Sequence, residues 1–385
     1  MTVYDMKKSL SSVEEERALE LHDRATIVAL HTDYIGDISE RRSRGEKRIM
    51  ETRHVPKLLE GGITAICDHV IGETFECLCF PLNSLINTPY SSVNFPMRKH
   101  YGWTRFHVTN PFKHALQLMD YVLSDLEESS GISPVSTING IVEAKRQEKI
   151  AMILCAQGCA AIEDDLSILR NFYRLGIRCV SLVVNHRNLL ADSIWSHTNH
   201  GLSEFGEEVV KEANRLGIVI DVSHISKKGF MDVLNLSSDP LIASNVNVHA
   251  VCDNFKNLSD EMIKALAENG GVIGLHAKSD LVNKKKKSTV EDLLSHVDYI
   301  TGIVGVDHVG IGPDIVSIDM YPKESCDRIW GEGRPFLGHY PEGFEHISKM
   351  INITRGLVKR GYSDQEIEKV LGLNALRVLK KVWGN

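Results

Sequence analysis

The sequence lacks the positive charge excess, the regularly spaced cysteine pairs and the long apolar runs that mark several protein classes. Its 385 residues carry a formal net charge of −7 with a pI of about 6.2, which argues against nucleic-acid binding. Eight cysteines show no regular CxxC spacing, so we expect free thiols in a reducing compartment rather than a disulfide framework. No apolar run reaches the roughly 18–20 residues that span a bilayer.

From the residues at the two ends of the sequence we expect neither a signal peptide nor a lipid anchor. Residues 1–17 include no apolar segment of the kind found in a signal peptide, and the final LKKVWGN lacks the hydrophobic tail of a lipid anchor. Cys67, Cys155, Cys179 and Cys252 fall in predicted strands or helices, where free cysteine behaves as a small buried hydrophobe. These features predict a cytoplasmic protein with neither a membrane nor a nucleic-acid partner.

One pattern occurs five times: a helical stretch, a glycine, a short apolar run, then His, Asp or Asn. The copies are LLEGGITAICDH (58–69), RLGIRCVSLVVNH (174–186), RLGIVIDVSH (215–224), ENGGVIGLH (268–276) and GVDHVGIGPD (305–314). Each copy predicts a helix closed by a glycine and then a buried parallel strand. Three further strands are expected at 26–33, 149–158 and 240–245. The pattern predicts an α/β fold, a (β/α)8 TIM-type barrel that spans 1–385 as a single domain.

About eight helices should surround the strands, with an extra N-terminal helix at 12–25. Others are expected at 112–129, 137–147, 163–175, 206–216 and 260–268, and Ser363–Glu366 predicts a capping box for the final helix. Residues 72–111 are expected to form a long loop after strand two, which is more typical of a lid or contact loop than of a linker. For residues 95–108 two interpretations stay open: a cover over an anionic or aromatic substrate, or a dimer contact.

Polar side chains stand where the predicted strands end. His31 and Asp33 are two residues apart, so they point to the same side and can chelate a divalent cation. Asp314 ends the last strand, which neighbours the first strand in a closed barrel. His224 ends strand five, and its alternative role is that of a core histidine bonded to a backbone carbonyl.

Residues from about 18 to 383 resemble the renal (membrane) dipeptidase family of metallopeptidases, within the amidohydrolase superfamily. The resemblance is carried by VALHTD (28–33), ADSIWSHTNHGLSEFGEEVVKEANRLGIVIDVSHIS (191–226), LSDEMIKALAENGGVIGL (258–275), GVDHVGIGPD (305–314) and LGLNALRVL (371–379). It implies a (β/α)8 barrel, often dimeric, with a two-zinc site that hydrolyses dipeptides. We therefore expect a homodimer.

The resemblance places His31 and Asp33 on the family's first two metal ligands and His224 on a ligand of its second metal. Asp314 falls on the acid that handles the proton of the attacking water. Four positions depart from the family: Gln157 replaces a bridging Glu, Asn245 a ligand His, Val184 a His that helps hold the substrate carbonyl, and Lys256 an Arg that binds a substrate carboxylate.

These departures predict one divalent ion, zinc, in each chain rather than two. A neutral Gln157 offsets little of the repulsion between two ions, and Asn245 leaves His224 as the only strong ligand of the second site. The predicted metal ligands are His31, Asp33, His224, Asp314 and Gln157. The residues predicted to contact the substrate are Lys256, Asn245, Asn185, His69 and His276.

We expect a metal-dependent hydrolase in which metal-activated water cleaves a small amide or amino-acid-derived substrate, with Asp314 as the catalytic proton acceptor. Dipeptide cleavage itself is less expected, because the His that helps hold the carbonyl is absent. Two alternatives stay open: a lyase, isomerase or tailoring enzyme on the same fold, and an inactive binding protein. Metal content separates the binding protein from the enzymes, and incorporation of solvent oxygen separates hydrolysis from the other reactions.

Overall fold

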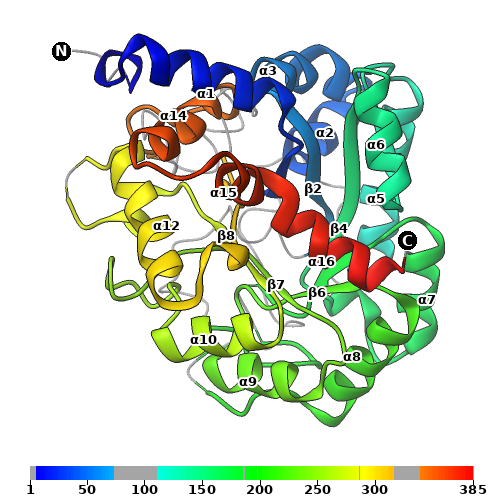
Figure 1. Ribbon diagram of the computed structural model, residues 1–385. Helices are drawn as coiled ribbons and strands as arrows, with labels where there is room; N and C mark the ends of the chain where they lie inside the picture. Colours follow the sequence, from blue (N-terminus) through cyan, green and yellow to red (C-terminus); the bar gives the residue numbers. More distant parts are fainter. Residues whose placement is uncertain are drawn as a thin grey trace.

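Eight parallel strands close into a barrel with helices around it (Figure 1). The computed structural model describes residues 6–72, 111–184, 187–196, 198–285, 287–315 and 339–384. The barrel strands are β1 (Ile27–Thr32), β2 (Ile63–Gly72), β4 (Ile150–Gln157), β5 (Cys179–Ser181), β6 (Val219–Asp221), β7 (Ile242–Val246), β8 (Val272–Leu275) and β9 (Val309–Ile311). Pairing runs in that order, and β9 pairs back with β1. The predicted (β/α)8 barrel is therefore confirmed.

One strand was not predicted. β3 (Ile132–Val135) pairs in parallel with β4 from outside the closed ring, which makes the sheet nine-stranded. Its sequence, ISPV, has four residues with a central proline, and only Ile132 is fully buried. A segment this short shows neither alternation nor a continuous apolar run, and its proline is tolerated because β3 lies at an edge.

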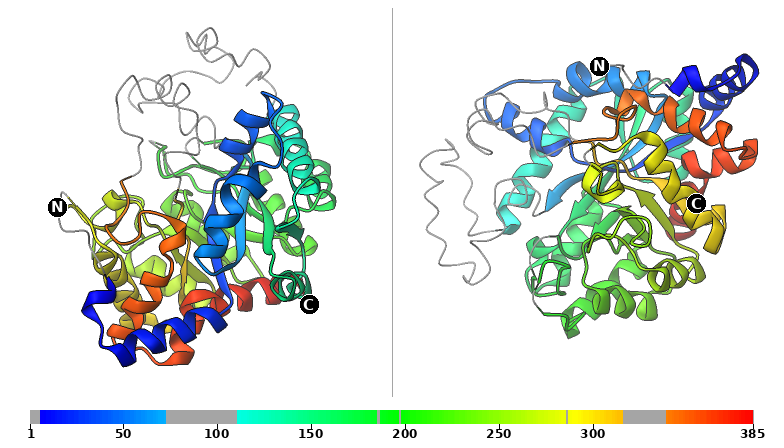
Figure 2. Two further views of the ribbon diagram at one scale, coloured as in Figure 1. Left: turned by 90° about the horizontal axis from the view of Figure 1, so that it is seen from above. Right: turned by 90° about the vertical axis from the view of Figure 1, so that its left-hand side faces the viewer.

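The helices connect the strands and cover the outside of the barrel (Figures 1 and 2). They are α1 (Ser12–Arg24), α2 (Ile35–Arg42), α3 (Val55–Glu60), α5 (Pro111–Glu127), α6 (Ile138–Arg146), α7 (Leu166–Arg174), α8 (Glu204–Leu216), α9 (Lys227–Leu236), α10 (Asp260–Glu268), α11 (Ser279–Val282), α12 (Val290–Val304), α14 (Ile351–Lys359), α15 (Asp364–Glu368) and α16 (Asn374–Trp383). The expectation of about eight helices was too low, since α2, α9, α11 and α14 were not predicted, and α3 and α12 were predicted only as the helical stretches before Gly62 and Gly305. The predicted loop after strand two, including 95–108, lies outside the described residues apart from its two end positions.

The repeated pattern corresponds to a real backbone feature. In all five copies a glycine between helix and strand has a positive φ: Gly62, Gly176, Gly217, Gly270 and Gly305. A side chain at such a φ is strained, so glycine ends each helix and turns the chain into the next buried strand. The capping box at Ser363 and Glu366 is also present.

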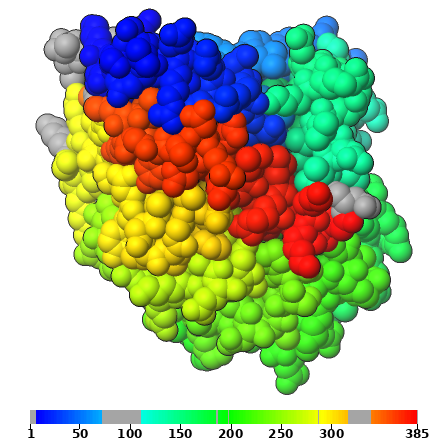
Figure 3. All heavy atoms as spheres, viewed as in Figure 1, coloured from blue at the N-terminus to red at the C-terminus, as the bar shows by residue number. Residues whose placement is uncertain are grey.

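The barrel is closed at its amino-terminal end by α16, drawn in red across the strands in Figure 1. Ala375, Val378, Leu379 and Val382 of this helix pack with interior barrel residues such as Val28 in one apolar cluster. The predicted extra helix, α1, lies beside α14 on the surface (Figure 3), where Arg355 Nη2 is 2.5 Å from Glu15 Oε1. With α16 over the amino-terminal end, the polar strand ends gather at the other, carboxyl end.

Cysteine burial agrees with the expectation, because Cys67, Cys155, Cys179 and Cys252 are buried free thiols, but Cys252 lies in a turn after β7 rather than in the predicted strand or helix. None of the described helices is long and apolar enough to cross a bilayer.

The wall of the barrel near its mouth depends on a glycine without a side chain. A Cβ atom added to Gly312 would lie 1.6 Å from the Ser244 carbonyl oxygen. Gly312→Ala should therefore lower the free energy of unfolding by at least roughly 1–3 kcal/mol, the usual cost of overpacking. Chemical denaturation would measure the loss. Gly302→Ala in α12, where a Cβ meets nothing within 4 Å, is the matched control and should not destabilise. Equal stability of both variants would contradict this description of the wall.

Candidate metal and catalytic site

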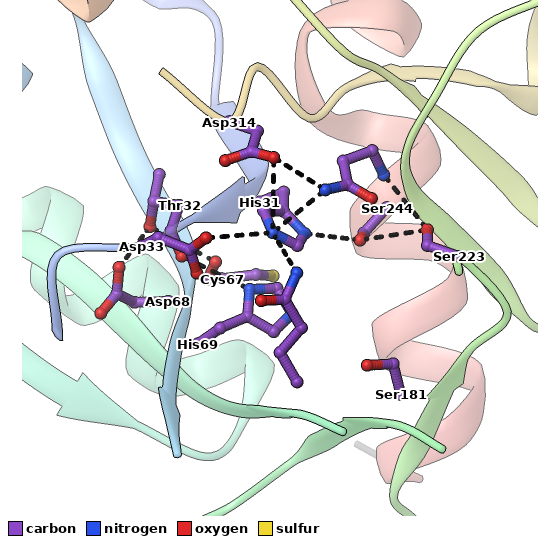
Figure 4. A network of polar contacts seen from close by, with 12 residues as sticks. His31, Thr32, Asp33, Cys67, Asp68, His69, Ser181, Ser223, Ser244 and Asp314 are labelled. Carbon is purple, nitrogen blue, oxygen red and sulfur yellow. Dashed lines mark hydrogen bonds and ion pairs between the residues drawn. The ribbon is translucent and has the colours of Figure 1, made fainter. Parts of the chain in front are cut away.

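His31 lies at the centre of the polar residues in the barrel mouth (Figure 4). It is fully buried, and its Nε2 atom lies 3.8 Å from Asp33 Oδ2 and 4.0 Å from Asp314 Oδ2. His31 stands on β1, Asp33 directly follows that strand, and Asp314 follows β9, which pairs with β1. Barrel closure therefore brings together two carboxylates and an imidazole from opposite ends of the sequence.

A chain of hydrogen bonds determines which nitrogen of His31 carries its proton. The Ser244 hydroxyl donates to Asp221 Oδ2 (2.5 Å), so the His31 Nδ1–H donates to Ser244 Oγ (2.7 Å). Asp221 also accepts the backbone N–H groups of Ser223 and Ser244, at 2.9 and 3.0 Å. These hydrogen bonds leave His31 Nε2 without a hydrogen, so its lone pair is directed into the mouth, as a metal ligand requires.

Two side-chain amides face that lone pair. Gln157 Nε2 donates to His31 Nε2 over 3.0 Å, and Asn245 Nδ2 lies 3.2 Å from the same atom. Asn245 Nδ2 also donates to Asp314 Oδ2 (2.9 Å), so this amide joins β1 to the end of β9. The amide hydrogens bring partial positive charge to the position that a cation would take, and an ion bound there has to turn them away.

Asp314 is held as a carboxylate by its neighbours. Burial alone would raise its pKa, but His276, His31, Lys256 and the Asn245 amide together lower the pKa below its usual range. His276 Nε2 lies 3.3 Å from Asp314 Oδ2, and Lys256 Nζ donates to His276 Nδ1 over 3.2 Å. The residue has a positive φ of 49°, a strained conformation of the kind that gathers at functional sites.

Asp33 is positioned by the residues on either side of it. Asp68 Oδ1 accepts the Thr32 hydroxyl (2.6 Å) and the Tyr34 backbone N–H (3.0 Å), which fixes the turn that presents Asp33. Burial and the nearby charge of Asp314 raise the pKa of Asp33 to about 7. A buried carboxylate in this state gains from any cation that neutralises it.

The chemistry of the donor set fits a divalent ion. The buried side-chain atoms without a hydrogen-bond partner include Asp33 Oδ1, His69 Nε2, Asn245 Oδ1 and both ring nitrogens of His224. Burial lowers the pKa of His69 to about 4 and that of His224 well below its usual value, so both rings stay neutral near pH 7. Each unsatisfied buried atom costs about 1–3 kcal/mol, and those of these atoms that coordinate an ion would recover that cost. His31, Asp33 and His69 offer donor atoms that all lie within 4.8 Å of one another.

The structure connects most of the predicted site residues. His31, Asp33, Gln157, Asn245, Asp314, His276 and Lys256 are linked by the contacts above, and the His31 and His69 rings stack at 3.9 Å. His224 lies close enough for the charges of Lys256 and His31 to act on it, and Asn185 lies outside the described residues. Sequence reasoning missed Asp221 and Ser244. A charged residue inside the apolar run VIDV was the available signal, because buried carboxylates need partners.

The sequence model of the membrane dipeptidase family (peptidase family M19) matches residues 15–328 and 331–384. The chain belongs to this family. Dipeptidase tcpJ of Claviceps purpurea is 34% identical over 240 residues, which cover 62% of this chain and 52% of the relative. Human Dipeptidase 3 is 30% identical over 274 residues, which cover 70% and 52%. The chain thus spans about half the length of these curated relatives.

Solved structures show the same fold. A metallopeptidase of Rhodobacter sphaeroides, liganded with a phosphinate mimic of the dipeptide L-Ala-D-Ala, superposes with a TM-score of 0.74 at 22% identity. The match covers 94% of this chain and all of that one. At this identity the likeness concerns the fold, and the chemistry of the mouth has to be argued from this chain's own residues.

The hydrogen-bond chain makes Ser244 testable as a positioning residue. Ser244→Ala removes the acceptor for His31 Nδ1–H, so zinc affinity should fall by the ten- to hundredfold that loss of such a partner costs. A competition titration with a chromogenic chelator would measure the affinity, and Ser244→Thr should restore it. Ser223→Ala is the matched control, because the Ser223 hydroxyl forms a long hydrogen bond with Ser244 Oγ (3.4 Å) and accepts the Asn245 N–H (3.3 Å), but does not lie between His31 and Asp221. Unchanged zinc affinity in Ser244→Ala would contradict the assignment.

Proposed function

We propose that this protein is a metal-dependent hydrolase that cleaves a small amide bearing a carboxylate, such as an amino-acid conjugate. The observation that carries the proposal is the position of Asp33 and Asp314, whose carboxylates both lie within 4.0 Å of His31 Nε2. His31 and Asp33 would hold the ion. A bound divalent ion lowers the pKa of water toward neutrality and polarises a carbonyl.

Asp314 is the group that takes the proton from the attacking water. Its Oδ2 atom accepts the Asn245 amide N–H and lies 3.3 Å from His276 Nε2, and these two contacts hold the carboxylate in place. The low pKa of Asp314 keeps it ionised and ready to accept a proton. Asp314 then passes this proton to the leaving nitrogen.

Lys256 supports a substrate with a carboxylate. Burial lowers its pKa to about 8, and its ammonium group donates to His276 Nδ1 while keeping further hydrogens for an anion. Phe255, next to it, meets the Trp195 ring edge-to-face at 4.3 Å, and the buried Trp195 Nε1 has no partner. A substrate that bears a carboxylate beside an apolar side chain would place its carboxylate on the Lys256 ammonium group and its apolar part against Phe255 and Trp195.

Ordinary dipeptide cleavage is less well supported. Val184, which stands where the resemblance expects the His that helps hold a substrate carbonyl, is buried and apolar, so it donates nothing to that oxygen. The relatives are named dipeptidases, and the phosphinate bound to the Rhodobacter protein is a dipeptide mimic. Dipeptides are therefore the first substrates to try, with N-acyl amino acids beside them.

We propose zinc as the metal, with one ion per chain, because imidazole and carboxylate donors suit it. The homodimer is proposed from the family resemblance alone, and light scattering would test it. A cytoplasmic location is proposed from the buried free thiols. We further propose a small-molecule substrate, without nucleic-acid or membrane partners, from the acidic net charge.

A second function, binding without hydrolysis, is favoured by one observation. The amides of Gln157 and Asn245 direct hydrogens at His31 Nε2, so a metal-free mouth satisfies its own central histidine. A binding protein would retain the pocket without stoichiometric metal. Metal analysis of protein purified without chelator separates the two functions.

Asp314→Asn tests the catalytic role directly. Asparagine keeps the size of the side chain but accepts no proton, so turnover should fall at least ~100-fold while the thermal midpoint stays close to that of the unmodified protein. The assay is hydrolysis of dipeptides and N-acyl amino acids in ¹⁸O-labelled water, where label in the product proves hydrolysis. Near-normal turnover in Asp314→Asn, or products without label, would rule out the mechanism proposed here.

Lys256→Met tests the substrate class. Loss of a hydrogen bond to a charged group costs about 1.5–3 kcal/mol, so KM for a substrate with a free carboxylate should rise roughly ten- to a hundredfold. KM for the same compound with that carboxylate amidated should change little. Lys278→Met is the control, since Lys278 is a more exposed lysine that pairs with Asp280 at 3.8 Å. An equal rise for both substrates would show that Lys256 does not bind the carboxylate.

A further inference from the structure

The proposed hydrolysis leaves two buried imidazoles in the mouth, His69 and His224, without a role. His69 stands on β2 with its side chain fully buried. Its Nδ1–H donates to the Thr32 carbonyl oxygen over 3.4 Å, and its Nε2 has no partner. We propose that His69, which the family resemblance does not assign to the metal, is the third protein ligand of the ion, beside His31 and Asp33. The assignment rests on the proposed metal dependence.

The distances between their donor atoms set His31, Asp33 and His69 apart from the other histidines and acidic residues. Among the described residues, His31, Asp33 and His69 are the only three His, Cys, Asp or Glu side chains that offer donor atoms all within 4.8 Å of one another. Ligands of a tetrahedral zinc ion lie roughly 3.3 Å apart, given bonds of about 2.0–2.1 Å. The three donors therefore need to contract only modestly around an ion.

The strand register explains why these side chains meet. Thr32 of β1 is paired with Asp68 of β2, so Asp33 and His69 are the next residues along two adjacent parallel strands. Asp68 also fixes the turn at Asp33 through Thr32 and Tyr34. His69 is thus supported by the same strand pair that presents the first two ligands.

The rings have to turn relative to each other before they can share an ion. An imidazole binds metal in its own plane, and the stacked rings of His31 and His69 are tilted by 28° rather than parallel. His31 is fixed by its short hydrogen bond to Ser244, whereas the hydrogen bond of the His69 ring, to the Thr32 carbonyl oxygen, is long. Rotation of His69 about its Cβ–Cγ bond would increase the angle between the two planes, so we infer that His69 is the ring that turns.

His224 is the competing imidazole, and it makes a matched control. It lies three residues beyond the end of strand β6, and both of its ring nitrogens are buried without a hydrogen-bond partner. Within the described chain it forms no group of three donors with His31 and Asp33 inside 4.8 Å. In this account the ion lies toward β1 and β2. The hydrogen bonds that join His31 to Ser244 and Asp221 are on the opposite side of the His31 ring. Gln157 then does not need to contribute a negative charge to the site.

The test titrates zinc alone into each metal-free variant and follows binding by calorimetry. His69→Gln should lose at least the ten- to hundredfold affinity that removal of an outer-shell partner already costs, whereas His224→Gln should stay within about threefold of the unmodified chain. The reverse pattern overturns the assignment of His69 and leaves metal dependence intact. If the unmodified chain binds no zinc, the proposed function itself fails.

A second experiment looks for a new signal, so that its result cannot be mistaken for misfolding of the glutamine variants. His69→Cys places a thiolate where the imidazole stood, and cobalt(II) bound to a thiolate acquires a strong near-ultraviolet charge-transfer band. His69→Cys with cobalt(II) should show this band, and His224→Cys should not. The band in His224→Cys alone would assign the third ligand to His224 instead.

Discussion

The hydrogen bond from His31 Nδ1 to the Ser244 hydroxyl determines which nitrogen of the central histidine faces the mouth of the barrel. Asp221 accepts the Ser244 proton over 2.5 Å, so the direction of the whole chain is set by a buried carboxylate. If the direction were reversed, His31 Nε2 would carry a hydrogen and bind no cation. The packing that holds Ser244 in place therefore matters to the chemistry, including the close approach of Gly312 to its carbonyl oxygen.

The barrel itself was predictable because its signal is local. Five glycines with positive φ end helices and begin strands, and this pattern is legible in the sequence. β3 was not predictable, since four residues with a proline show no periodicity. The strand-end residues were found one by one, but their contacts were not. The link between Lys256 and His276, or between Asn245 and both His31 and Asp314, depends on how separate strand ends face one another.

The substitutions at Gln157 and Asn245 have an electrostatic meaning that the structure makes concrete. Both side chains are neutral, and both present amide hydrogens to His31 Nε2 where a second cation would need an anion or a ligand. Two divalent ions a few ångströms apart repel strongly, and this mouth offers no carboxylate at the bridging position to offset that repulsion. The two nearest carboxylates, Asp33 and Asp314, together balance the charge of a single divalent ion.

The number of ions per chain tests this account most directly. Protein purified without chelator and dialysed against metal-free buffer can be measured by elemental analysis together with amino-acid analysis, so that metal and protein are both counted. The account predicts about one divalent ion per chain, because one site keeps strong nitrogen and oxygen ligands. Two tightly bound ions per chain would contradict it, since Gln157 and Asn245 would then have failed to remove the second site.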